Sequence, residues 1–477
     1  PPRSTLFPYT TLFRSPYRGT AQFSVGTGYH EDAFDFAPDA QVVSGDLVGF
    51  NQQSPLRGAI NTTELFAEAR LPLLGDKPLV QTLELTLGYR WSDYSLSGPA
   101  NAYKGELNWQ VADPFRVRTS YNRAVRAPSV AELFTPANQG FPPLLEDPCE
   151  ITSIARSGAD GILGTADDPA SRAQVESLCV AQGVEDIDVY TYGFTQVESF
   201  AGGNPSLDEE TADTLTFGFV VDSTSTNPWL EKVRVSLDYW NIKLNDAIFL
   251  VPAGEILLLC YNYQGGNPNY DPGNPACQAI DRDDPNAQIP VTNGPIVRGT
   301  ALDNVSELET SGIDLQLDWG FDLGRAGRLA TNTVVSYLNQ FDVTYRDGLP
   351  VIDRVGTIGD GGEAVGVAAA YPEYKVLFNT DYRLGDFRLG ARYRFIPSME
   401  NKYRSYDDAT TIGTPSVSYV DLNASWYITD AAEIAIGALN VADKQPPLYT
   451  NSPQMNTDPS TYDVLGRRFF ARASYKF

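Results

Sequence analysis

Apolar and polar side chains alternate from residue 17 onward with a period of two, not with the 3.6-residue period of a helix. The alternating runs cover about nine to fourteen residues, whereas strands of soluble sandwiches average about five or six. A tilted strand crosses a bilayer in about 9–11 residues, with its apolar face toward lipid and its polar face toward the lumen. The alternation assigns six marker residues to these faces: Leu85, Leu389 and Ala424 to lipid, and Glu84, Arg392 and Asn423 to the lumen.

The pattern predicts an all-β chain that forms an antiparallel transmembrane β-barrel with about fourteen strands. Short and long connections alternate between the strands, except that residues 95–99 form a short connection on the long side. Short periplasmic turns and long extracellular loops are typical of outer-membrane barrels. The predicted strands are residues 17–29, 57–71, 79–93, 100–112, 114–124, 209–222, 231–246, 298–320, 325–343, 372–384, 386–397, 416–428, 432–442 and 464–477.

Composition narrows the function classes. A net charge of −25 disfavours nucleic-acid binding, because a phosphate backbone is met by a basic surface. The chain has one histidine, His30, and no G-x-S-x-G segment, which argues against a His-ligated metal centre, a Ser-His-Asp hydrolase and enzymatic activity generally. No apolar run approaches the ~18 residues of a membrane helix. We expect a protein that is not an enzyme and uses no cofactor.

The first fifteen residues differ from the rest of the chain. Residues 5–15 resemble the translation of a common sequencing-adaptor oligonucleotide, so we interpret residues 1–15 as an assembly artefact and residues 16–477 as the barrel region. On this interpretation, residues 1–15 pack against nothing and the true start of the protein lies upstream. The alternative is a genuine N-terminal segment with packing contacts of its own.

Four segments and the end of the chain resemble one protein family. The segments are Arg126-Ala127-Pro128-Ser129 with Glu132-Leu133-Phe134, Gly203-Asn204-Pro205-Ser206-Leu207 with Glu209-Glu210-Thr211-Ala212-Asp213, Leu308-Glu309-Thr310-Ser311-Gly312-Ile313-Asp314, and Ala438-Leu439-Asn440-Val441-Ala442-Asp443-Lys444. In this order they resemble motifs of TonB-dependent outer-membrane receptors, although Val441 and Ala442 replace the usual pair of the last motif. The final strand, with Tyr475 and the terminal Phe477, resembles the recognition signal of the barrel-assembly machinery. The alternative is an ordinary final strand of a soluble sheet.

The resemblance implies a barrel of about 22 strands closed by an N-terminal plug, which moves when the TonB protein pulls a short N-terminal box. It implies an outer-membrane receptor of a Gram-negative bacterium that takes up a scarce ligand of the siderophore, cobalamin, saccharide or peptide class with energy from the TonB complex. The barrel-assembly machinery, outer-membrane lipid and lipopolysaccharide are the other implied partners. A passive porin, a barrel enzyme and a soluble β-protein remain as alternatives.

With about fourteen strands and no plug or box, the sequence predicts the C-terminal part of such a barrel. We expect an open, curved sheet whose edges are the strand near residues 21–29 and the strand that ends at Phe477, with no plug in the lumen. An unpaired edge in lipid leaves backbone groups unsatisfied, so this fragment should not transport on its own. A ladder between residues 22–28 and 468–476 would instead indicate a complete barrel.

The four cysteines lie in two of the long loops. Cys149 and Cys179 share one loop, and Cys260 and Cys277 share another. Because the predicted location is external and oxidising, we expect one disulfide within each loop. The alternative is four free or mispaired thiols, and the spacing does not suit zinc.

The first of these loops is strongly acidic. Within it, Asp160, Asp167 and Asp168 are carboxylates set among glycines, and oxygen ligands of this kind suit Ca²⁺. The segment lacks the EF-hand ligand series, so the alternative is a solvated acidic loop.

Two further groups are candidates for ligand contact. Tyr261, Tyr263 and Tyr270, beside several asparagines, could stack a sugar or an aromatic ligand, although such residues are also common in turns. Seven arginines on polar strand faces are predicted to line the lumen, where they could attract anionic ligands or pair with lumen acids and the plug. They are Arg116, Arg118, Arg388, Arg392, Arg394, Arg468 and Arg472.

Overall fold

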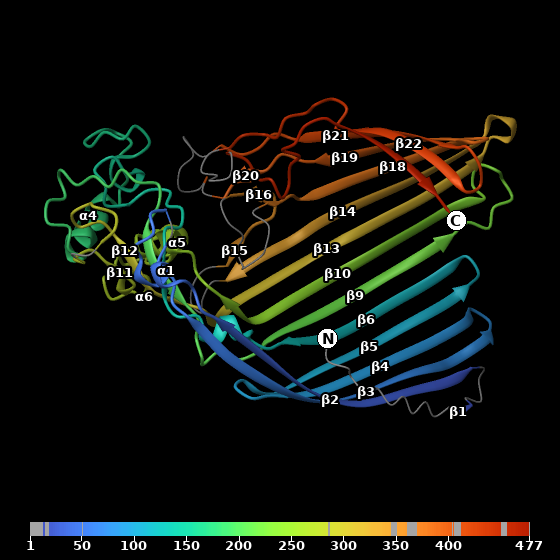
Figure 1. The fold of residues 1–477 in the computed structure, drawn as a ribbon, viewed down its shortest axis with the longest axis horizontal. Helices are drawn as coiled ribbons and strands as arrows, with labels where there is room; N and C mark the ends of the chain where they lie inside the picture. The colour runs from blue at the N-terminus through green and yellow to red at the C-terminus, as the bar shows by residue number, and fades with distance from the viewer. Residues whose placement is uncertain are drawn as a thin grey trace.

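The computed structural model describes residues 13–14, 19–49, 51–284, 287–344, 351–359, 370–402, 404, 412–449 and 456–476. The main element of the fold is one antiparallel sheet of 16 strands (Figure 1). Two of the 16, β1 (Phe13–Arg14) and β15 (Ile352–Asp353), have two residues each, and the other fourteen match the predicted strands one to one. The fourteen are β2 (Thr20–Phe36), β3 (Leu56–Lys77), β4 (Val80–Tyr94), β5 (Gly98–Ala112), β6 (Phe115–Arg126), β9 (Glu210–Asp222), β10 (Lys232–Phe249), β13 (Asp303–Asp322), β14 (Arg328–Thr344), β18 (Tyr374–Leu384), β19 (Phe387–Ile396), β21 (Val417–Tyr427), β22 (Ala432–Leu439) and β23 (Arg468–Tyr475).

The two faces of the sheet differ as the alternation predicts. Residues that pair across antiparallel strands share a face. Leu389 is paired with Ala424, whereas the next residue, Gly390, is paired with Asn423 on the other face. Leu389 is 53% exposed, and neither it nor Leu85 belongs to a buried apolar cluster in the described part of the chain. Among the described residues, no second layer of protein therefore covers the apolar face, unlike the inner face of a two-sheet sandwich.

The sheet is open in the described residues, because no ladder joins β2 to β23. The predicted open sheet is confirmed in this respect. The side of β2 that faces away from β3 pairs with β1 at its first two residues: Phe13 pairs with Ala21 and Arg14 with Thr20. The prediction that residues 1–15 pack against nothing is therefore wrong for these two residues, whose backbone pairs with the edge of β2. The terminal Phe477 lies outside the described residues, and the side chain of Tyr475 in β23 is exposed.

Long connections gather at one end of the sheet and short turns at the other (Figure 1). The long connections contain two small sheets, β7 (Asn138–Gly140) with β8 (Glu198–Gly202), β12 (Ile296–Ala301) and β11 (Ile280–Asp281), and β17 (Ala370–Tyr371) with β16 (Thr357–Ile358) and β20 (Glu400–Asn401). Residues 298–301, predicted as part of a barrel strand, thus belong to β12 instead. The helices are α1 (Ala40–Ser44), α2 (Val130–Phe134), α3 (Ile154–Ser157), α4 (Arg172–Ala181), α5 (Ala253–Cys260) and α6 (Pro275–Gln278), with 3₁₀ turns at Tyr263–Gly265 and Gly324–Ala326. Not one of these described helices has the length and apolar character needed to span a membrane.

Aromatic side chains gather where the strands meet the short turns. The rings of Trp319 and Phe321 lie 4.6 Å apart, and Trp229 lies 5.5 Å from Phe321. The indole N–H of Trp319 donates to the carbonyl of Trp229 at 2.7 Å, and that of Trp109 donates to the carbonyl of Leu79 at 2.9 Å. Large rings with one satisfied polar group suit a membrane–water boundary.

Candidate functional site

The two cysteine-containing connections fold together into one body, which we call the loop module: the described residues of 127–209, between β6 and β9, and of 250–302, between β10 and β13. One buried apolar cluster takes side chains from both connections, including Leu178 and Val197 from the first and Leu257 and Val297 from the second. Strand β8 of the first connection pairs in parallel with β12 of the second. Neither connection is therefore an independent loop, since each supplies half of a common core.

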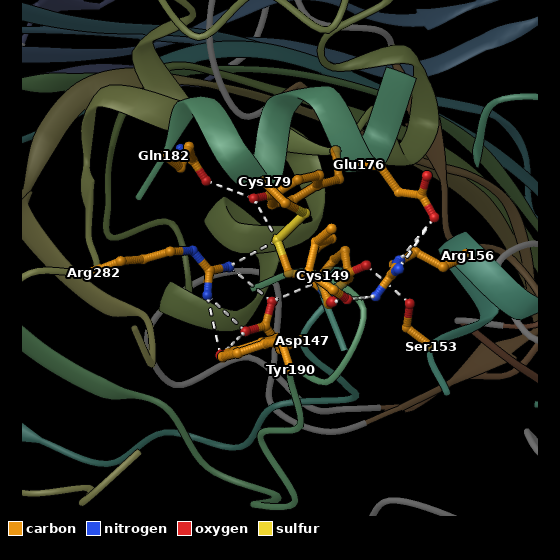
Figure 2. The surroundings of a disulfide bond; sticks show 12 residues. Asp147, Cys149, Ser153, Arg156, Glu176, Cys179, Gln182, Tyr190 and Arg282 are labelled. Carbon is orange, nitrogen blue, oxygen red and sulfur yellow. Dashed lines mark hydrogen bonds and ion pairs between the residues drawn. A yellow bond between two sulfur atoms is a disulfide. The ribbon is translucent and has the colours of Figure 1, made fainter. Parts of the chain in front are cut away.

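Each half of the module contains one of the expected disulfides. Cys149 is bonded to Cys179 with Cα atoms 5.7 Å apart, and Cys260 is bonded to Cys277 with Cα atoms 4.8 Å apart. Figure 2 shows the first bond beneath α4. All four cysteines are buried in the loop module. Such crosslinks stabilise a fold by restricting its unfolded states.

A fully buried ion pair joins the two halves. The Arg282 guanidinium donates two hydrogen bonds of 2.8 Å to the Asp147 carboxylate, and both side chains are 0% exposed (Figure 2). The Tyr190 hydroxyl donates to the same carboxylate at 2.7 Å, and the Arg282 guanidinium also donates to the Asn293 carbonyl. Burial alone would raise the pKa of Asp147, but the charge and hydrogen bonds of Arg282 outweigh it and lower that pKa below its usual range.

Of the three tyrosines considered for ligand contact, Tyr261 and Tyr263 are buried inside the loop module, and Tyr270 is partly buried against its apolar cluster. The Tyr261 hydroxyl donates to the side chain of Gln182 at 2.6 Å, and burial raises the pKa of Tyr261 to about 12. Tyr263 is only 5% exposed. Asn267 donates to the Cys260 carbonyl at 2.8 Å and accepts from the backbone of the following turn. These side chains hold the module together, so turn and core chemistry explains them better than ligand stacking does.

Two of the four motifs that carry the family resemblance join the loop module to the sheet. Arg126, the last residue of β6, donates to both Glu210, the first residue of β9, and Glu132 of α2. Ser129 and Glu132 form a reciprocal capping box that starts α2. Gly203 lies so close to the backbone of α2 that a side chain there would overlap the Glu132 carbonyl. These residues therefore fix where the first half of the module leaves the barrel strands.

The asparagine of the last motif has a similar role. Asn440 is fully buried with φ +49°, and its side chain both donates to and accepts from the backbone of Lys444. Its own N–H donates to Asp421 at 2.8 Å. This turn closes the end of β22 onto β21.

Most of the seven strand arginines are paired with acids on neighbouring strands or loops. The nearest acidic partners are Asp238 for Arg118, Asp381 for Arg388, Asp421 for Arg394, Asp463 for Arg468 and Glu433 for Arg472. Arg392 donates to Asn379 at 3.1 Å, and the Nε of Arg116 is buried without a hydrogen-bond partner. Two roles were considered for these arginines: attracting anionic ligands, and pairing with acids of the lumen. The observed contacts fit pairing with acids better than a set of unpaired cations that bind an anion.

The calcium candidates accept hydrogen bonds from their own loop. Asp160 accepts from the backbone of Ile162 and Asp168 from that of Gly164, both at 2.8 Å, and Asp167 accepts from the Thr165 hydroxyl at 2.6 Å. Over the described ranges there is no group of three or more His, Cys, Asp or Glu side chains that could hold a metal ion. The arrangement is that of a self-bonded acidic loop.

The exposed charge of the loop module is acidic. Residues 127–209 and 250–302 contain nineteen Asp and Glu, four Arg, and no Lys or His. All four arginines contact carboxylates: Arg156 with Glu176, Arg172 with Asp168 and Glu176, Arg282 with Asp147, and Arg298 with Asp281 and Asp284. The most exposed charged residues of the module are Asp160, Asp167, Glu185, Asp186, Asp188, Asp208, Asp271 and Asp283.

The alternation of apolar and polar residues along the strands could not identify the partners of the four arginines in the loop module. A usable signal was nevertheless present, because an arginine in a loop so rich in acids is more often a structural partner than a free charge. For Arg282, this rule would have predicted a structural ion pair, but it would not have identified Asp147 as the partner.

Comparison with known proteins agrees with this architecture. The model of the family "TonB dependent receptor-like, beta-barrel" matches residues 3–441. No curated protein sequence matches the chain. The fold is similar to a mutant of the ferric enterobactin receptor PfeA of Pseudomonas aeruginosa in complex with enterobactin (14% identity, TM-score 0.57, 98% of this chain and 53% of that one). It is also similar to the siderophore receptor PirA of Acinetobacter baumannii (15%, 0.54, 98% and 53%) and the FrpB iron transporter of Neisseria meningitidis (13%, 0.51, 98% and 54%).

At these identities the solved structures establish the fold alone, and this chain spans about half the length of each. The family match covers most of the chain and includes the four motifs except the last three residues of the final one. It also agrees with a sheet that has long connections on one side. The chain therefore belongs to the family of TonB-dependent receptor-like β-barrels.

Proposed function

We propose that this chain is part of an outer-membrane receptor that takes up a scarce ligand with energy from the TonB system. The observation that carries the proposal is the family match over residues 3–441, together with a folded loop module at one end of a sheet whose apolar face is uncovered. The similar structures are described as receptors or transporters for siderophores or iron, so an iron chelate is the first ligand class to test. The seven strand arginines line the lumen side, and residues 16–477 are the barrel region.

The test is uptake by the complete gene product in a Gram-negative host that lacks its own siderophore receptors. Radiolabelled ferric enterobactin, ferrioxamine B and cyanocobalamin serve as probes. We expect accumulation of one probe class that disappears when the host lacks TonB or when a protonophore collapses the membrane potential.

A passive porin would behave differently. It would admit small solutes regardless of TonB, with uptake proportional to external concentration. Accumulation that is indifferent to TonB and to the protonophore would therefore reject the proposal and favour the porin.

A further inference from the structure

The loop module touches a second structured part of the same end of the molecule, which we call the rim sheet: β16, β17 and β20, formed by the connections that follow β14 and β19. Glu255 on α5 of the module is 1% exposed, and its Oε1 accepts a hydrogen bond of 3.0 Å from the Lys402 ammonium. The Arg354 guanidinium lies 3.8 Å from the same oxygen and is also buried. One carboxylate of the module thus faces two cations of the rim.

Both cations are held in place by the rim sheet. The Lys402 N–H donates to the Ile358 carbonyl at 2.8 Å, and the Lys402 side chain crosses Gly359 so closely that a side chain there would overlap it. The Arg354 backbone is bonded to Phe341 at the end of β14 and to Thr357 of β16. These contacts direct the two charges toward the module from one small, ordered unit.

Glu255 is equally well fixed on its own side. It lies in the first turn of α5, and the last residue of that helix, Cys260, is tied to Cys277 by the second disulfide. Close approach of Gly254 to the Pro143 carbonyl packs the same turn against the first half of the module. The Tyr263 hydroxyl, just beyond α5, donates to the Lys402 carbonyl at 3.3 Å and adds a second contact across the boundary.

We propose that Glu255, Lys402 and Arg354 form a latch that holds the loop module against the rim sheet. The module has its own apolar core, and so has the rim region around Ile358, Met399 and Tyr419. We expect two bodies with separate cores to come apart at this ionic contact more easily than either body unfolds. Removing one partner of a buried ion pair leaves a buried charge with less compensation, so such a change should shift the two bodies toward separation.

These residues are positioning residues for ligand capture. Loop modules of a receptor stand between solvent and the lumen, so the latch sets how often that path opens. The structural part of this inference is independent of the ligand; only its consequence for ligand retention rests on the proposed function.

The test compares hydrogen exchange of the full-length protein in nanodiscs with that of Glu255→Gln, of Lys402→Met and of the double variant. We expect exchange in α5 and in residues 400–402 to rise by about tenfold or more in Glu255→Gln, which removes the carboxylate from both cations. The rise should be smaller in Lys402→Met, where Glu255 still faces Arg354. Exchange in α4, inside the module, should stay unchanged. The double variant should be less disturbed than Glu255→Gln alone, because in the double variant only Arg354 has lost the Glu255 carboxylate. A bound ligand should dissociate faster in the same variants.

The matched control is Glu176→Gln, which weakens ion pairs to Arg156 and Arg172 within the module. It should raise exchange in α4 and leave residues 400–402 as they are. Tyr263→Phe is a milder probe that removes one hydroxyl from the boundary, and it should raise exchange at residues 400–402 by a few-fold, in line with one hydrogen bond.

The proposed latch is rejected if Glu255→Gln and Lys402→Met leave hydrogen exchange unchanged on both sides of the boundary. It is also rejected if these variants raise exchange in α4 as much as in α5. If the exchange pattern appears as expected but TonB-dependent uptake is absent, the latch stands and the proposed function fails.

Discussion

Arg118 of β6 and Asp238 of β10 are joined by hydrogen bonds of 2.8 and 2.5 Å, although β9 lies between their strands. The residue of β9 in register with both is Gly218, and a side chain there would occupy the place of the Asp238 carboxylate. The same arrangement recurs where Lys104 of β5 reaches Glu68 of β3 at 2.7 Å across Gly88 of β4. Glycines on the polar face thus allow charges two strands apart to pair.

Replacing Gly218 by Ala should break the Arg118–Asp238 contact. An overpacked site typically costs about 1–3 kcal/mol, while a half-exposed ion pair contributes only about 0–1 kcal/mol, so the steric part should dominate. The urea midpoint of the refolded protein should fall. Gly105→Ala is the control, because a Cβ there meets only Leu87 at 3.7 Å, and that variant should leave the midpoint unchanged or slightly higher.

Breaking the Asp147–Arg282 pair should destabilise the loop module more than any exposed pair does. Asp147→Asn leaves the buried Arg282 charge without a counter-ion, a change that typically costs about 3–5 kcal/mol. Replacing both residues, as in Asp147→Leu with Arg282→Met, should restore much of that loss. Hydrogen exchange of α4 measures the effect, and a double variant as unstable as Asp147→Asn would show that the pair contributes through packing and not through charge.

The pH dependence of the module follows from the lowered pKa of Asp147. A carboxyl whose pKa is lower in the folded state stabilises the fold above its unfolded value, about 3.9 for Asp, and loses that contribution as the pH falls further. Glu150, whose pKa is raised by burial, works in the opposite sense. We expect exchange protection of α4 to persist from pH 7 to about pH 5 and to fall below about pH 4. Loss of protection near pH 6 would contradict this, since the module contains no histidine.

The sequence predicts the sheet far better than the loops, for a physical reason. Alternation in β19 places Leu389 and Arg392 on opposite faces, because a strand fixes side-chain direction locally. Asp147 and Arg282 are 135 residues apart, and no local pattern encodes their meeting. Tyr261 shows the same limit, since a tyrosine among asparagines is compatible with a ligand contact or a core, and only the fold of the module decides.

The first disulfide should contribute measurably to the module. Cys149 and Cys179 close a loop with a sequence separation of 30, for which chain entropy gives a stabilisation of about 3–4 kcal/mol. The Cys149→Ser, Cys179→Ser double variant should therefore be cleaved faster by protease within residues 127–209, the first half of the loop module. The rim sheet, which contains neither cysteine, should be cleaved at the unchanged rate, and equal acceleration in both places would indicate global unfolding.

The acidic surface of the loop module should bias which ligands reach it. With the arginines of the module paired and its most exposed charges negative, the local potential repels anions and attracts cations before any contact forms. Ferric enterobactin is a trianion and ferrioxamine B a cation. Neutralising one exposed cluster with Glu185→Gln, Asp186→Asn and Asp188→Asn should raise the association rate of the first by about two- to fivefold and lower that of the second.

A second triple variant serves as the control that distinguishes the local electrostatic field of the loop module from the net charge of the protein. Glu231→Gln, Asp386→Asn and Asp430→Asn remove three exposed carboxylates from the short turns at the opposite end of the strands. This variant changes the total charge equally but should leave both association rates unaltered, because the screening length in physiological salt is only about 8 Å. The difference made by the loop variant should itself shrink when salt is raised to about 1 M, where the length falls to about 3 Å. Equal effects of the two triple variants, or an effect that persists in high salt, would show that the acids of the loop module do not steer the ligand.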